Sequence, residues 1–141
     1  MRPWPAAAIA AALPLALPAA GAGAVSVRIT SVRVVDAQTR RPAPAPLRRT
    51  RDYAYVVRYR VAGERTMRVT RRAVIVDAQG TVMARVRPPA TFDEPGSYFA
   101  TSRISIGPDD PVGTYRLRYA VVVRGRRAVD RAVRVTRLRF R

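Results

Sequence analysis

Carboxylates are the only side chains of this sequence that could support general acid–base catalysis. The chain has no His and no Cys, which rules out a Ser-His-Asp triad, a cysteine nucleophile and metal sites built on imidazole or thiolate. It also has no glycine-rich phosphate-binding loop. Adjacent carboxylates occur twice, at Asp93-Glu94 and Asp109-Asp110, and paired carboxylates can divide the acid and base roles between them.

The neighbours of both acidic pairs favour turns over catalysis. Each pair lies beside Pro and Gly, and Asp and Pro are common in turns for backbone reasons. The same carboxylates could hold Ca²⁺ together with backbone carbonyls, but no D-x-D-x-D-G spacing is present. We therefore expect no catalytic residue, no metal site and no cofactor. An enzyme would need one of these pairs in a cleft, with a perturbed pKa.

Arginine is the other side chain that could carry a function. The chain has 27 basic against 9 acidic residues, a net charge of +18 and a pI near 11.8, and every basic residue is Arg. A GC-rich genome would replace Lys with Arg, but it would not create the excess of positive charge. Solubility needs a net charge of only about 2–8, so the excess indicates anion binding, for which the guanidinium is well suited. The alternative is that these are solvated surface residues that also protect strand edges.

Alternating apolar residues place many of these arginines on β-strands. In 53–61 the apolar side chains share one face, and Arg58 and Arg60 take the other. We expect changes of phase at Ser31 and near Arg71-Arg72, and a hairpin turn in which Gly80 adopts a positive φ. The last strand is predicted to point Val129, Val133 and Val135 inward. Seven strands are predicted, near residues 25–34, 53–61, 66–77, 82–86, 98–106, 115–123 and 129–135.

The end of the chain resembles bacterial immunoglobulin-like domains. Pro111-Val112-Gly113-Thr114-Tyr115 is followed by an alternating strand and a hairpin, and this pattern carries the resemblance over the last third of the chain. The Cys pair and core Trp of antibody domains are absent. The resemblance implies an all-β, antiparallel two-sheet immunoglobulin-like sandwich of about seven strands, without a particular activity. It identifies Tyr115 as a tyrosine-corner residue, with Gly113 and Gly80 as structural glycines.

Such a sandwich would gather arginines on one sheet. Its third, sixth and seventh strands lie together, so their outward arginines would share a face on which like charges destabilise one another unless an anion binds. Those expected on this face are Arg68, Arg72, Arg116, Arg118 and Arg134. The proline-rich loop 40–51 adds a second candidate cluster, namely Arg40, Arg41, Arg48, Arg49 and Arg51.

The N-terminus is typical of a secretory signal peptide. Residues 1–24 combine Arg2, a short apolar stretch and the small-residue end Ala22-Gly23-Ala24. We expect a periplasmic or extracellular domain of residues 25–141, with no transmembrane segment after signal cleavage. The alternative is that the segment stays as an uncleaved anchor.

Three functions are compatible with these features. The first is a non-enzymatic binding module for an anionic surface or polymer, such as lipopolysaccharide, acidic glycan or lipid head groups. The second is a structural or accessory domain that binds an acidic envelope protein. The third is an enzyme built on a carboxylate pair. Sequence-specific nucleic-acid binding is disfavoured, because the tyrosines fall on the apolar strand faces and not on a stacking surface.

Overall fold

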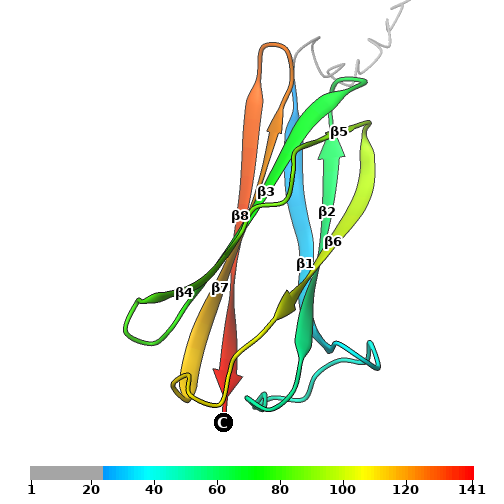
Figure 1. The fold of residues 1–141 in the computed structure, drawn as a ribbon. Helices are drawn as coiled ribbons and strands as arrows, with labels where there is room; N and C mark the ends of the chain where they lie inside the picture. The colour runs from blue at the N-terminus through cyan, green and yellow to red at the C-terminus, as the bar shows by residue number, and fades with distance from the viewer. Residues whose placement is uncertain (1–23) are drawn as a thin grey trace, which may run out of the picture.

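The computed structural model describes residues 24–141, so the predicted signal segment lies outside the described residues except for Ala24. Within this range the chain forms eight strands, and no helix that could cross a membrane occurs there (Figure 1). The strands are β1 (Ser26–Asp36), β2 (Tyr53–Ala62), β3 (Met67–Val76), β4 (Val82–Val86), β5 (Thr91–Asp93), β6 (Gly96–Ile104), β7 (Gly113–Arg124) and β8 (Val129–Phe140).

The strands form two antiparallel sheets packed face to face (Figure 1). One sheet has the order β1-β2-β6, and the other has the order β4-β3-β7-β8 with β5 paired to β3. The predicted all-β sandwich is thereby confirmed. The third, sixth and seventh predicted strands are β3, β7 and β8, and they are neighbours as expected. The additional strand is the three-residue β5, which lies in a predicted loop.

Large aromatic side chains fill the space between the sheets. Tyr55 of β2 and Tyr119 of β7 meet edge to face, with ring centroids 5.8 Å apart. Tyr53 packs in the same way on Phe140, at 6.3 Å. Because these rings come from opposite sheets, they lock the sheets together through apolar burial and edge-to-face contact. The tyrosines of β2 face the core, as their alternation predicts.

The phase of β3 differs from the prediction. Its pairing with β7 runs without interruption from Arg68 opposite Arg124 to Val76 opposite Arg116. The predicted slip near Arg71-Arg72 is therefore wrong, and Arg71 occupies an inward position. The slip at Ser31 is confirmed, as a register shift between Ile29 and Ser31. A lone Arg in an inward position imitates a phase change in the sequence, because the apolar alternation is broken either way.

The phase of β8 is also the reverse of the prediction. Val129, Val133 and Val135 lie on the outer face and are 54%, 42% and 55% exposed. The strand continues to Phe140, and Leu138 and Phe140 are buried in the opposite phase. The two sets cannot both point inward because side chains alternate strictly. The register that buries Leu138 and Phe140 beneath the opposite sheet turns the valines outward.

Candidate functional site

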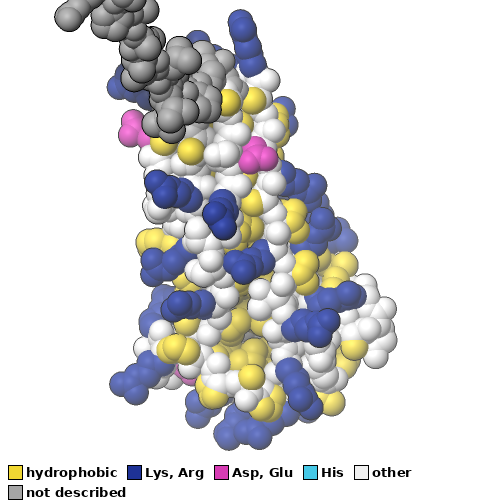
Figure 2. Space-filling model, turned by 180° about the vertical axis from the view of Figure 1, so that it is seen from behind, with side chains coloured by type: hydrophobic (Ala, Val, Ile, Leu, Met, Phe, Trp, Pro, Cys, Tyr) yellow, Lys and Arg dark blue, Asp and Glu magenta, His cyan; other side chains and the backbone are white. Residues whose placement is uncertain are grey.

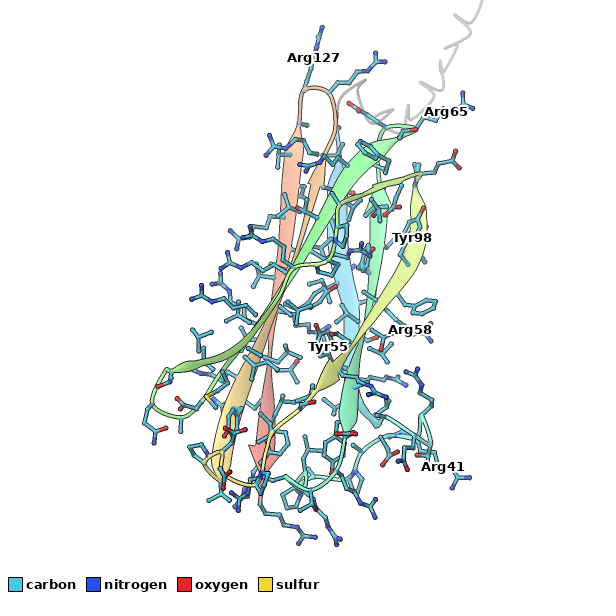
Figure 3. All side chains as sticks on the ribbon, viewed as in Figure 1. Arg41, Tyr55, Arg58, Arg65, Tyr98 and Arg127 are labelled. Carbon is cyan, nitrogen blue, oxygen red and sulfur yellow. The ribbon has the colours of Figure 1, made fainter. Side chains whose placement is uncertain are left out.

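The outer face of the β4-β3-β7-β8 sheet is dense in arginine. Strand register places arginines from all four strands on it, and in Figure 3 side chains ending in nitrogen project from this sheet away from the core. In the described part of the chain, no Asp or Glu shares the face. Its arginines are Arg68, Arg72, Arg85, Arg116, Arg118, Arg124, Arg131, Arg137 and Arg139.

Four of the five predicted sheet arginines lie on this face, and Arg134 does not. Arg134 pairs with the buried Tyr119, so it has the inward phase of β8 and is exposed only because β8 is an edge strand. Its place on the outer face was therefore predicted wrongly, for the same reason as that of the β8 valines. Arg131 lies two residues after Val129, so it has the same phase and occupies the outer face instead of Arg134.

Arginines and apolar residues alternate across the centre of this face. Arg72 lies opposite Ala120, and Arg118 lies between Val74 and Val135 on the neighbouring strands. Ala120 is only 8% exposed although it points out of the sandwich. The hydrocarbon stems of long arginine side chains cover apolar surface in this way. The face is thus an apolar floor surrounded by guanidinium groups.

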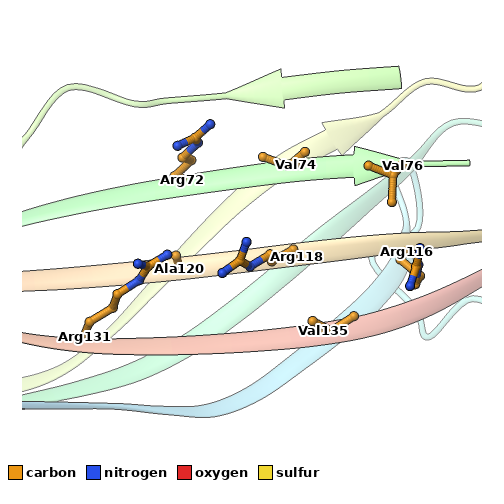
Figure 4. Close-up of a pocket in the computed structure, with 8 residues that line it drawn as sticks. All are labelled: Arg72, Val74, Val76, Arg116, Arg118, Ala120, Arg131 and Val135. Carbon is orange, nitrogen blue, oxygen red and sulfur yellow. The ribbon is translucent and has the colours of Figure 1, made fainter. Parts of the chain in front are cut away.

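Two adjoining hollows lie on the face. The first, of about 320 Å³, has Val74, Val76, Ala120 and Val135 as its apolar lining, with arginines between them (Figure 4). Figure 4 shows Arg131 reaching from β8 toward Ala120 of β7. The second hollow, of about 630 Å³, shares three lining residues with the first, namely Arg72, Ala120 and Arg131. Both volumes lie near the typical range for small-ligand sites, about 300–1,000 Å³.

The second hollow lies beside a gap in the edge of the sheet. β5 pairs with β3 at 67–69, and β4 pairs with β3 at 73–76, so residues 70–72 have no strand partner on that side. The connection through Arg87, Pro88 and Pro89 passes this gap and lines the hollow. Pro88 and Pro89 cannot donate to a ladder, which ends β4 here as predicted and keeps the gap open.

The loop arginines do not join this face. The loop lies at the end of the sandwich that also holds the C-terminus, and Arg41 points away from the protein there (Figures 1 and 3). Arg49 donates from its Nη1 to the carbonyl oxygens of Pro108 and Asp110, at 2.6 and 2.7 Å. Arg51 lies 3.9 Å from Asp36, and Arg40 adopts φ +60°. Arg48 is exposed and lines a separate hollow of about 290 Å³ with Arg49 and Arg141.

Positive charge is also present elsewhere on the surface. Figure 2, taken from behind, shows Arg side chains along the whole height of the molecule and few acidic ones. Register places further arginines on the outer face of the β1-β2-β6 sheet, namely Arg28, Arg33, Arg58, Arg60 and Arg103. The β4-β3-β7-β8 face is distinguished by its hollowed apolar floor more than by its charge.

The acidic pairs are separated from each other, and one member of each pair makes a local hydrogen bond. Asp93 and Glu94 precede β6, and Asp109 and Asp110 lie beyond its other end. Asp110 Oδ2 accepts a hydrogen bond from the Gly107 amide at 2.7 Å, and Asp93 Oδ2 accepts one from the Thr91 hydroxyl at 3.0 Å. Across residues 24–141 no three acidic residues gather where they could hold a metal ion.

The predicted structural residues have the expected geometry. The hydroxyl of Tyr115 donates to the carbonyl oxygen of Pro111 at 2.5 Å, four residues upstream, as a tyrosine-corner residue does. Gly80 has φ +85° in the turn between β3 and β4, and Gly113 has φ +131° at the start of β7. Both values lie in a region that favours glycine.

Sequence reasoning missed several arginines of the site. Arg85, Arg124 and Arg131 follow from strand register, and the β7–β8 hairpin would have given Arg131 if Leu138 and Phe140 had been used to set the phase. Arg71 and Arg87 depend on the gap between β4 and β5. That gap has no sequence signal beyond the Pro-Pro pair.

Comparisons with known proteins bear on the fold alone. No protein-family model matches the chain, and no curated protein matches its sequence. The crystal structure of the C-terminal domain of wzt is similar, with a TM-score of 0.63, 11% identity, and coverage of 84% of this chain and 75% of that one. The putative ApaA protein from Bordetella pertussis gives a TM-score of 0.48 and 21% identity, covering 84% of this chain and 94% of that one.

Proposed function

We propose that this chain is an exported, non-enzymatic binding module of the immunoglobulin-like type, which binds an anionic component of the cell envelope on the outer face of the β4-β3-β7-β8 sheet. The observation that carries the proposal is that this one face carries nine arginines and two adjoining hollows, while none of the acidic side chains of residues 24–141 lies on it.

Electrostatics supports an anionic ligand. Arg68 lies directly opposite Arg124, and Arg116 lies opposite Arg137. Like charges facing each other across strands are unfavourable, and a bound phosphate or carboxylate would relieve the repulsion through charge-assisted hydrogen bonds. The immunoglobulin-like assignment is supported by the sheet order, by the wzt likeness in fold and by the Tyr115 contact.

An acidic protein partner is the second candidate. The exposed Phe92 and Phe99, at 72% and 68% exposure, are the observation that favours it, because aromatic side chains are enriched in protein interfaces. They lie on different sheets, beside β3 and on β6, so one interface would have to wrap around an edge of the sandwich.

Binding to a panel of anionic targets at low and physiological salt tests the proposal. The panel contains lipopolysaccharide, vesicles with anionic lipid, a heparin-like glycan and DNA, with neutral vesicles as the control. We expect one target to keep micromolar or tighter affinity at physiological salt. Equal, weak affinity for every polyanion that disappears with salt would contradict a dedicated anion site, because such binding is generic charge attraction.

A further inference from the structure

Two buried polar groups without partners lie on the inner face of the sheet, one of them on Arg71 beside the gap in the edge of β3. Arg71 enters from the inner face of the sheet, and its Nη2 donates to the carbonyl oxygen of Pro89 at 3.2 Å. Its Nε is buried and has no acceptor among residues 24–141, and the hydroxyl of Tyr119 is in the same condition. Arg71 and Tyr119 are diagonal neighbours on the inner face, since Ala73, two residues from Arg71, pairs with Tyr119.

Buried polar groups without partners are uncommon and unfavourable. A core designed only for stability would place an apolar side chain where Arg71 stands, because an unpaired buried donor costs roughly 1–3 kcal/mol. Arg71 instead lines the larger hollow together with Arg68, Arg72, Arg87 and Arg131. A hollow lined by five arginines is a suitable setting for a compact anion that carries more than one negative charge.

The adjoining hollow has the opposite character. It continues from the arginine-lined hollow across Ala120 to Val74, Val76 and Val135. A wholly polar glycan or nucleic acid gains little from this floor, since the benefit of apolar contact comes from removing apolar surface from water. The unpaired stretch of β3 is only three residues long, so it offers little for strand addition by a protein partner.

We infer that the ligand is an anionic amphiphile, whose phosphate-type head group lies between Arg71, Arg72 and Arg131 and whose hydrocarbon chain lies over Val74 and Val135. The inference rests on the proposed function, because it specifies the ligand of the same face. The ligand is a phosphate-bearing, lipid-like molecule, and free phosphate and acidic peptides are the comparison ligands in the test below.

The test is calorimetric titration of the purified protein with alkyl phosphates from ethyl to octyl, beside inorganic phosphate, octyl glucoside and a glutamate-rich peptide. We expect the affinity to rise at least about tenfold from ethyl to octyl phosphate, since each methylene adds buried apolar area. Octyl glucoside should not compete with octyl phosphate for the protein. Arg71→Gln should weaken every alkyl phosphate by a similar factor.

Two valines of β8 provide a matched test of where the hydrocarbon chain of the ligand lies. Val135 lines the apolar hollow, whereas Val129 is equally exposed, at 54% against 55%, and lines neither of these two hollows. Val135→Asn should abolish the dependence on chain length, and Val129→Asn should preserve it. Equal effects of the two variants would overturn the inference, as would an acidic peptide that binds as tightly as octyl phosphate and is unaffected by Val135→Asn.

The failure of this inference can be told apart from failure of the proposed function. If affinity does not depend on chain length while a polyanion still binds the face, only the amphiphile assignment is wrong. If neither alkyl phosphates nor any polyanion of the panel binds this face, the proposed function is wrong as well.

Discussion

Arg71 of β3 and Pro89 of the β4–β5 connection are joined by a hydrogen bond of 3.2 Å, donated by Nη2 to the prolyl carbonyl oxygen. The bond spans the gap where β3 has no strand partner on that side. It holds a charged side chain at the margin of an otherwise apolar core, close to the hydroxyls of Tyr59 and Tyr119. Burial raises the pKa of both tyrosines, and the positive charge of Arg71 opposes that rise.

Replacing Arg71 with Met should separate stability from binding. The Arg71→Met variant loses the bond to Pro89, worth roughly 0.5–1.5 kcal/mol, but it also removes a buried donor whose unpaired state costs a similar amount. We expect the free energy of unfolding to stay the same or to rise, while affinity for anions falls. Urea denaturation and binding measured on one preparation check both. A large loss of stability would show that Arg71 is a structural residue of the core.

The hydrogen bond between Tyr115 and Pro111 should contribute measurably to stability. Tyr115→Phe removes the hydroxyl that binds the Pro111 carbonyl and should lower the free energy of unfolding by about 1 kcal/mol. Tyr98→Phe is the control, because its hydroxyl makes the same kind of bond, to Glu94, at an exposed position. Urea midpoints should fall more for Tyr115→Phe. If the control lost as much or more, the contact between Tyr115 and Pro111 would have no special role.

One carboxylate connects the edges of the two sheets. The amide of Val27 in β1 donates to Asp130 Oδ2 of β8 at 2.8 Å. Asp130→Ala leaves this partly buried amide without an acceptor, so we expect a loss of roughly 1.5–3 kcal/mol in thermal or urea unfolding. Glu64→Ala, which removes an exposed acceptor from the Arg126 amide, should cost less. Equal losses would mean that the connection between the sheets adds nothing.

The protein should lose stability at alkaline pH, because its buried tyrosines favour the protonated form. Burial raises the pKa of Tyr55, Tyr59, Tyr115 and Tyr119 above the ordinary value of 10.0. Unfolded chains therefore lose these protons first, and the stability present below pH 10 is lost as pH rises above it. No Lys, His or Cys side chain titrates in this range. Phenolate absorbance should rise together with unfolding, and reversible titration of all six tyrosines near pH 10 with the fold intact would contradict this.

The sequence predicted the architecture better than the site. Alternation in 53–61 was sufficient to place β2 and its tyrosines, because every second residue there is apolar and large. It failed in β8, where two apolar sets compete and the stronger one lies beyond the predicted end of the strand. It also failed at Arg71, because a charged residue in an inward position reads as a change of phase. The hollows depend on how β4 and β5 divide the edge of β3, which is a tertiary property.

The loop arginines show the same limit. Their clustering in 40–51 was apparent from the sequence, but whether they face a ligand depends on the partners that the fold supplies. Arg49 is engaged with two carbonyl oxygens, and Arg51 lies near Asp36. Burial of Leu47 against the last strand draws the loop to the end of the sandwich, away from the candidate face.

Two charge-matched variants test the proposed anion-binding face most directly. Arg72, Arg118 and Arg131 surround the hollows, and Arg28, Arg58 and Arg60 lie exposed on the outer face of the other sheet. Each triple change to Gln removes the same amount of charge, so generic attraction falls equally in both. Titration with anionic vesicles at physiological salt should show at least about tenfold weaker binding for the first variant and little change for the second. Equal losses in the two variants would contradict a binding site on the β4-β3-β7-β8 face.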